Sequence, residues 1–158
     1  IRKSELLLYT TLVHIGNQEY KTAKKYISNA IIDHNIKYLP LMRTIRLVRL
    51  IVFYEVQEHE LIQYESRSIT RSLSSPKEQT FKTERIILWF LNKRNIPILR
   101  KDREAFWEKL SPEIHELYNN KYESQLLRLF DFTAWMESKI RKEKLSEVLR
   151  ARSSAKEC

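Results

Sequence analysis

Residues 39–54, LPLMRTIRLVRLIVFY, form the most apolar stretch of the chain. Only Arg43, Arg46 and Arg49 interrupt it, and their spacing of three places them on one stripe of a helix. A helix that is apolar around most of its circumference needs neighbours on several sides. The stretch therefore predicts a central helix that begins at Pro40 and ends near Glu55.

The rest of the sequence also indicates helices with short connections. Apolar residues recur at spacings of three and four, and no sustained apolar–polar alternation predicts a strand. Gly16 is expected to end the first helix, and Asn17 is expected to cap the second. The expected helices cover residues 2–14, 20–31, 40–55, 59–73, 81–91, 100–110, 113–118 and 123–150.

The near absence of glycine excludes several classes of enzyme. Gly16 is the only glycine among 158 residues, whereas phosphate loops, dinucleotide-binding turns and the nucleophile elbow of serine hydrolases need more than one. Both His-Glu segments, at His59 and His115, lack the second histidine of a zinc-protease helix. We therefore expect no catalytic site, no metal site and no cofactor.

Cysteine usage and hydropathy predict a cytoplasmic protein. The single cysteine, Cys158, excludes an intrachain disulfide and is typical of a reducing compartment. The longest run without a charged residue, Leu6 to Gln18, is too short to span a bilayer. Because the chain begins at Ile1 and has a helical pattern from Ser4, we expect a fragment, the C-terminal part of a longer protein.

A weak internal repeat links the first two helices to the central helix and its successor. An offset of 39 residues places Gln18-Glu19 on Gln57-Glu58. A pair of helices repeating every 34–47 residues or so is typical of α-hairpin solenoids. Residues 20–30, YKTAKKYISNA, resemble the second helix of a tetratricopeptide repeat, in which small residues stand where Ala23 and Ala30 lie. This resemblance implies a right-handed superhelical array of helix pairs.

A second resemblance covers most of the chain. Segments 46–54 (RLVRLIVFY), 66–71 (SRSITR), 82–88 (KTERIIL) and 130–140 (FDFTAWMESKI) resemble the C-terminal helical region of uncharacterised bacterial tetratricopeptide-like proteins. It implies a bacterial protein with that fold and brings no particular activity. We expect one all-helical, tetratricopeptide-like domain over residues 1–152 that ends in a long C-terminal helix, followed by a frayed tail at residues 153–158.

Arginines on the central helix and its successor are the candidate partner-binding residues. Guanidinium groups can hold the carboxylates of an acidic peptide, or phosphates. In the alternative interpretation, the arginines extend from a mostly buried helix and pair within the chain. The candidates are Arg43, Arg46, Arg49, Arg67 and Arg71, and the intrachain partners in the alternative are Glu55, Glu58 and Glu65.

The positive charge is spread along the chain. Of the net charge of +9, residues 1–79 carry +4 and residues 80–158 carry +5. Without a polybasic block, the charge does not by itself mark a nucleic-acid surface. We therefore expect a non-catalytic scaffold that binds a peptide or partner helix in a helical groove, with an acidic peptide as the main candidate. Sequence-tolerant nucleic-acid binding is the alternative.

Overall fold

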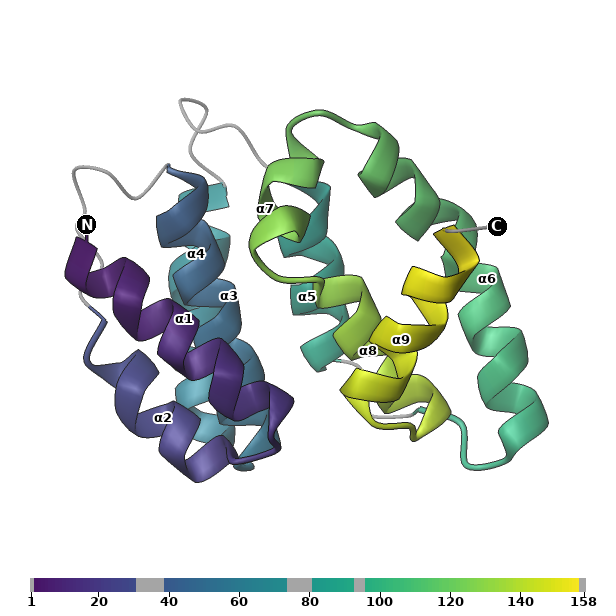
Figure 1. Cartoon of the computed structure of the whole chain (residues 1–158), viewed down its shortest axis with the longest axis horizontal. Helices are drawn as coiled ribbons and strands as arrows, with labels where there is room; N and C mark the ends of the chain where they lie inside the picture. Colours follow the sequence, from purple (N-terminus) through teal and green to yellow (C-terminus); the bar gives the residue numbers. More distant parts are fainter. Residues whose placement is uncertain (1, 31–38, 74–80, 93–95, 157–158) are drawn as a thin grey trace. The chain divides into compact units, whose positions relative to one another are not determined.

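The computed structural model describes residues 2–30, 39–73, 81–92 and 96–156, and every regular element within these ranges is a helix (Figure 1). The all-α prediction is thus confirmed for the described residues. The chain divides into two compact units, residues 1–84 and 85–158. The single domain expected over residues 1–152 stays a prediction.

The first unit is built around the predicted central helix. Its helices are α1 (Arg2–Gly16), α2 (Tyr20–Ser28), α3 (Pro40–Glu55) and α4 (His59–Leu73). Helix α1 packs on α2, α2 on α3 and α3 on α4, and α1 also touches α3. Residues 42–48 and 50–53 of α3 are all buried, as its apolar circumference requires.

A left-handed residue ends both α1 and α3, and neither of these residues is glycine. Gln18 has φ 62°, its N–H donates to the Ile15 carbonyl, and the next N–H, of Glu19, donates to the His14 carbonyl. This pair of bonds is a Schellman motif. Helix α1 ends at Gly16, as predicted, and the left-handed residue follows two positions later. The expected cap at Asn17 is wrong, because Glu19 precedes α2 and makes no side-chain cap bond.

The end of α3 has the same motif at the predicted offset of 39 residues. Gln57 has φ 61°, its N–H donates to Tyr54, and the N–H of Glu58 donates to Phe53. Burial repeats with the same offset. The buried pairs are Leu8 with Leu47, Thr11 with Leu50, Ala23 with Ile62, and Ala30 with Ile69. The first unit therefore contains two equivalent helical hairpins, α1–α2 and α3–α4.

The second unit is centred on α8 (Phe132–Arg141). Helix α5 (Lys82–Asn92) crosses the boundary between the units, and the other helices are α6 (Arg100–Asn119), α7 (Glu123–Leu129) and α9 (Leu145–Lys156). Helix α6 packs on both α7 and α8, and α9 packs on α8. Trp135 of α8 is buried and meets Phe90 edge-on, with ring centroids 5.6 Å apart.

The long C-terminal helix predicted over residues 123–150 is wrong, because two breaks divide it into α7, α8 and α9. Phe130 is extended, and the Asp131 carboxylate then caps α8 by accepting from the Ala134 N–H at 2.9 Å. Lys142 ends α8 in the left-handed conformation, with φ 60°. The tail expected from residue 153 is also wrong for its described part, since α9 continues to Lys156.

Helix α6 corrects a further prediction, because one helix replaces the two that were expected on either side of Pro112. A proline inside a helix loses one backbone hydrogen bond and costs about 3 kcal/mol. Burial on both sides of Pro112 offsets this cost. The buried stripe consists of Trp107, Leu110, Ile114 and Leu117.

Candidate functional site

Two of the predicted arginines are buried and bind carboxylates of their own chain. The Nη1 atom of Arg43 lies 2.6 Å from Oε2 of Glu84, and its guanidinium lies 4.8 Å from the centroid of the Phe81 ring. The Nε atom of Arg46 lies 3.5 Å from Oε1 of Glu65, the intrachain partner that the alternative interpretation named.

The other three arginines occupy two different environments. Arg49 donates from Nη2 to the carbonyls of Ile27 and Ala30, at 3.3 and 2.8 Å, so it ties α3 to the C-terminal end of α2. Arg67 and Arg71 are exposed on α4. The five arginines therefore do not form one surface, because Arg43 and Arg46 lie in the interior. Binding of an acidic peptide through them stays a prediction.

A groove between α6 and α9 is the strongest candidate site in the part of the chain that the structure describes. Its volume is about 640 Å³, and all its lining residues belong to the second unit. Helix α6 forms one side, α9 forms the other, and residues at the start and middle of α8 lie between them. The lining residues are Trp107, Ser111, Ile114, His115, Tyr118, Asn119, Asp131, Glu137, Arg152 and Ala155.

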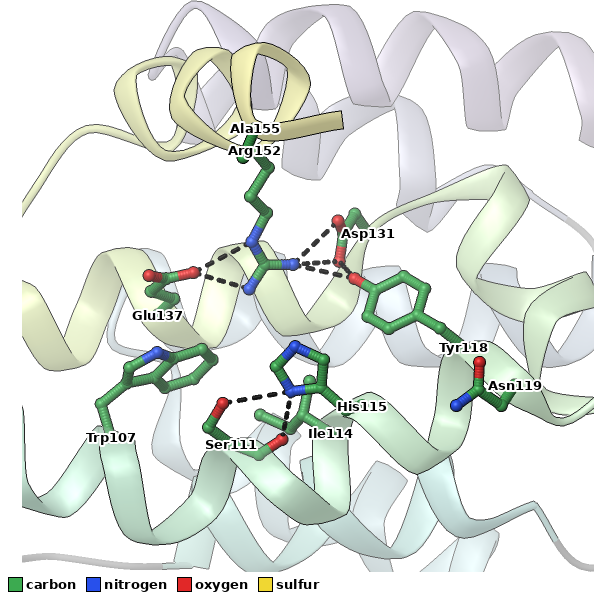
Figure 2. A pocket seen from close by; sticks show the side chains of 10 residues that line it. All are labelled: Trp107, Ser111, Ile114, His115, Tyr118, Asn119, Asp131, Glu137, Arg152 and Ala155. Carbon is green, nitrogen blue, oxygen red and sulfur yellow. Dashed lines mark hydrogen bonds and ion pairs between the residues drawn. The ribbon is translucent and has the colours of Figure 1, made fainter. Parts of the chain in front are cut away.

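Arg152 is the central charge of this groove, and Figure 2 shows its guanidinium between two carboxylates. Its Nη2 and Nε atoms lie 2.6 and 2.9 Å from Oε2 of Glu137, and its Nη1 lies 3.0 Å from Oδ2 of Asp131. The second oxygen of Glu137 lies 3.1 Å from Nε of Arg141. Two carboxylates thus face two guanidinium groups. Attraction to Asp131 and the bond to Glu137 outweigh burial and raise the pKa of Arg152.

Tyr118 completes this network from α6. Its hydroxyl donates to Oδ1 of Asp131 at 2.8 Å and accepts from Nη1 of Arg152 at 2.8 Å. Burial raises the pKa of Tyr118 to about 12, because a phenolate would lose hydration there. The phenol therefore stays protonated at neutral pH and acts as a fixed hydrogen-bonding group.

Ser111 and His115 resemble a nucleophile–base pair, but their geometry is that of a helix side-chain contact. Nδ1 of His115 lies 2.8 Å from the Ser111 carbonyl oxygen, which can only accept a hydrogen bond. Nδ1 therefore carries the proton, and it cannot take one from the Ser111 hydroxyl at 3.2 Å. The other ring nitrogen, Nε2, is left as an acceptor facing the groove (Figure 2).

The floor of the groove is apolar. Trp107 and Ile114 are both buried and lie seven residues apart on α6, which is two helical turns. The Trp107 ring also lies 5.8 Å beneath the Arg152 guanidinium, within the range of a cation–π contact. The groove thus combines an apolar base with a rim whose charges are already paired.

Sequence reasoning missed this groove for two reasons. It divided α6 at Pro112, so Trp107 and Ile114 were not placed on one helix. It also started a frayed tail at residue 153, next to Arg152. The spacing of Glu137 and Arg141, four residues apart on one helix, is a sequence signal for an ion pair beside the groove, and the structure places Nε of Arg141 3.1 Å from Oε1 of Glu137.

Comparisons with known proteins leave the family open. No protein-family model matches this chain, and no curated protein and no solved structure matches it either. The resemblances to tetratricopeptide repeats and to bacterial tetratricopeptide-like proteins therefore stay predictions. Among the described helices, none is long and apolar enough to cross a bilayer. Within the same residues, no cluster of three His, Cys, Asp or Glu side chains could hold a metal ion.

Proposed function

We propose that this chain is a non-catalytic protein-interaction module, and that the groove between α6 and α9 binds a short segment of a partner protein. The observation that carries the proposal is the groove itself. Its volume of about 640 Å³ lies within the range of known ligand pockets, roughly 300–1,000 Å³. It is large enough for one or two bulky side chains of a peptide.

The chemistry of the groove suits binding better than catalysis. The carboxylates of Asp131 and Glu137 are held by Arg152, and the pKa of Tyr118 is far above neutral. A general acid or base works best with a pKa near the operating pH, and the Ser111–His115 contact cannot move a proton in the required direction. The polar rim is therefore rigid and has its charges satisfied in advance, which lowers the cost of binding.

The groove also indicates what kind of segment fits. An apolar or aromatic side chain of the partner would lie on the floor of Trp107 and Ile114. The partner's backbone N–H groups would donate to His115 Nε2, and its polar groups would bond the Asn119 amide at the rim. A stacked array of helical hairpins, as predicted for the whole chain, is a common framework for such peptide sites.

The test is a selection from a library of random 12-residue peptides displayed on phage, with the purified chain as target. Ala155 lines the groove on α9 and is exposed, so Ala155→Trp fills the groove without entering the core. Ala151 is exposed on the same helix and does not line the groove, so Ala151→Trp is the matched control. Selected peptides should bind the control at least about tenfold more tightly than the filled variant, a difference of about 1.4 kcal/mol.

Two outcomes would contradict the proposal: no enrichment of any peptide, or equal binding to both tryptophan variants. Nucleic-acid binding, the alternative from the net charge of +9, makes a different prediction. Its affinity would fall steeply with salt. It would also fall when the exposed Arg67 and Arg71 are reversed to Glu, and Ala155→Trp would leave it unchanged.

A further inference from the structure

One end of the second unit exposes two adjacent apolar side chains. Ile98 and Leu99, which directly precede α6, are 83% and 67% exposed. Arg103 holds the backbone that carries them, because its N–H donates to the Leu99 carbonyl at 3.1 Å and its Nη1 donates to the Ile98 carbonyl. An isolated exposed apolar residue is ordinary, but Ile98 is the most exposed large apolar side chain among the described residues. We call this pair the apolar tip.

Basic residues from two segments of the chain lie at the same end of the unit as the apolar tip. Arg100 and Lys101 are exposed on the first turn of α6, directly after the tip. The second segment is the end of α8 and the turn to α9, which Figure 1 shows at the same end of the second unit as the start of α6. The hydrogen bond and the attraction to Glu104 raise the pKa of Arg100, and Glu143 of this turn is near enough to add to the attraction. The basic residues of the second segment are Lys139, Arg141, Lys142 and Lys144.

Most of the net charge of the second unit lies in these two segments. Residues 85–158 have a net charge of +5, from 16 basic and 11 acidic side chains, and residues 96–104 and 139–144 supply +4 of it, from seven basic and three acidic side chains. Arg141 also binds Glu137, which lies outside the segments, and the balance remains positive without it. Three lysines have no ion-pair partner among the residues that the structure describes, namely Lys101, Lys142 and Lys144. This end of the unit, here called the basic end, therefore presents positive charge beside the apolar tip.

We propose that the basic end of the second unit docks on the surface of a bilayer that contains anionic lipids. Ile98 and Leu99 would enter the boundary between headgroups and acyl chains, while the three lysines without ion-pair partners would contact the anionic headgroups. Apolar burial and electrostatic attraction act together in binding of this kind, and a single weak signal gives only marginal binding. The groove begins at Trp107, on a later part of α6, so this proposal does not depend on the function proposed for the groove.

The residue types at the basic end match a bilayer better than a protein or a nucleic acid. The cores of protein–protein interfaces are depleted in lysine, whereas four of the seven basic residues here are lysines. Surfaces that hold single-stranded nucleic acids combine positive charge with aromatic side chains on which bases stack. The apolar tip has only aliphatic side chains, which bury favourably among acyl chains and offer no stacking surface.

The test is co-sedimentation of the purified 158-residue chain with phospholipid vesicles. Vesicles of phosphatidylcholine and phosphatidylglycerol, mixed about 2:1, should bind the chain at least about tenfold more strongly than vesicles of phosphatidylcholine alone. Ile98→Ser with Leu99→Ser removes the apolar tip, and Lys142→Glu with Lys144→Glu reverses two unpaired charges. Each double variant should lower the affinity for the anionic vesicles by about tenfold or more. All four positions are exposed, and serine at position 99 suits the start of a helix, so the fold should be retained.

The matched control is Lys121→Glu with Arg128→Glu, which makes the same change in net charge at two exposed residues outside the basic end. It should alter the affinity by less than about threefold, because its charges lie outside the docking surface. No binding to the anionic vesicles would overturn the proposal, and so would equal weakening by the two charge-reversal variants. Unchanged affinity in the serine variant would overturn it too, because the attraction would then come from charge alone.

Discussion

Removal of one member of the buried Arg43–Glu84 pair should strongly destabilise the first unit. The two side chains are only 5% and 4% exposed, and their charged atoms lie 2.6 Å apart. Arg43→Met keeps most of the volume of the side chain and leaves the Glu84 carboxylate in the interior without its guanidinium. Breaking a buried pair in this way costs about 3–5 kcal/mol, chiefly because the remaining charge has lost its hydration.

The size of this loss should depend on pH. Burial raises the pKa of Glu84, and Arg43 opposes this shift. In Arg43→Met the opposition disappears, so the pKa rises further. A carboxyl with a raised folded-state pKa takes up a proton more readily in the folded than in the unfolded chain, so stability increases as pH falls through that pKa. The variant should therefore lose less stability at pH 5 than at pH 7.

A double-mutant cycle measures the pair itself. Urea unfolding, followed by circular dichroism at 222 nm, would be compared for Arg43→Met, Glu84→Leu and the double variant. The double variant should be more stable than the sum of the single losses predicts, by about 2–3 kcal/mol. The exposed pair of Arg100 and Glu104, 2.9 Å apart and one helical turn from each other, is the control and should show no measurable coupling. Equal behaviour of the two pairs would refute the reasoning.

Five single substitutions test the helix ends, the hairpin contact and the groove by urea or thermal unfolding. Gln18→Gly and Gln57→Gly should each stabilise the chain by about 0.5–1 kcal/mol, because glycine adopts φ near 60° without strain; a loss would contradict the Schellman geometry. Gly16→Ala should also stabilise it, by about 0.4–1 kcal/mol, since an added Cβ meets nothing within 4 Å. Ala23→Leu should cost about 1–3 kcal/mol, because Ala23 is fully buried; a neutral effect would indicate a loose contact. The pKa of Tyr118, raised from 10 to about 12, means that the folded chain holds this proton more tightly, so stability should fall as pH rises from 10 to 12, and less so in Tyr118→Phe.

The elements that were predictable are those in which local pattern and burial agree. The α3 stretch is apolar around most of its circumference, and its bounds at Pro40 and Glu55 are as predicted. The 39-residue offset also aligned the two Schellman motifs that follow α1 and α3. Their left-handed residues, Gln18 and Gln57, are not of a residue type that predicts a left-handed conformation. Propensity favours glycine at such positions. The motif can be recognised there only from the repeat.

The errors in the second unit have the opposite origin, because tertiary contacts overrode the local signals. Pro112 is a strong helix breaker in isolation, yet buried residues before and after it keep α6 continuous. The last predicted helix had a continuous helical pattern, yet the cap at Asp131 and the left-handed Lys142 divide it. The groove depends on the continuous α6, which places Trp107 and Ile114 on one helix. It also depends on the break before α8, because Asp131 both caps α8 and binds Arg152. Its composition could not be read from spacing along one helix.

The arginine stripe shows why a sequence pattern can indicate a residue's importance without its role. Arg43, Arg46 and Arg49 lie on one stripe of α3 as expected. Each one contacts a different helix: Arg43 contacts α5, Arg46 contacts α4, and Arg49 contacts α2. A guanidinium group has several hydrogen-bond donors, so it can bind a partner at the surface or connect helices in the interior. The sequence does not distinguish the two, because exposure depends on how the neighbouring helices pack.

The most direct test of the proposed binding site is a titration of the ¹⁵N-labelled chain with a phage-selected peptide, followed by two-dimensional NMR. If the peptide occupies the groove between α6 and α9, the indole N–H of Trp107 and the backbone amides of Asn119 and Ala155 should shift as the site saturates. The amide of Gln57, in the first unit, should not move. Saturable binding that leaves the Trp107 indole unchanged would contradict the assignment of this groove as the partner site.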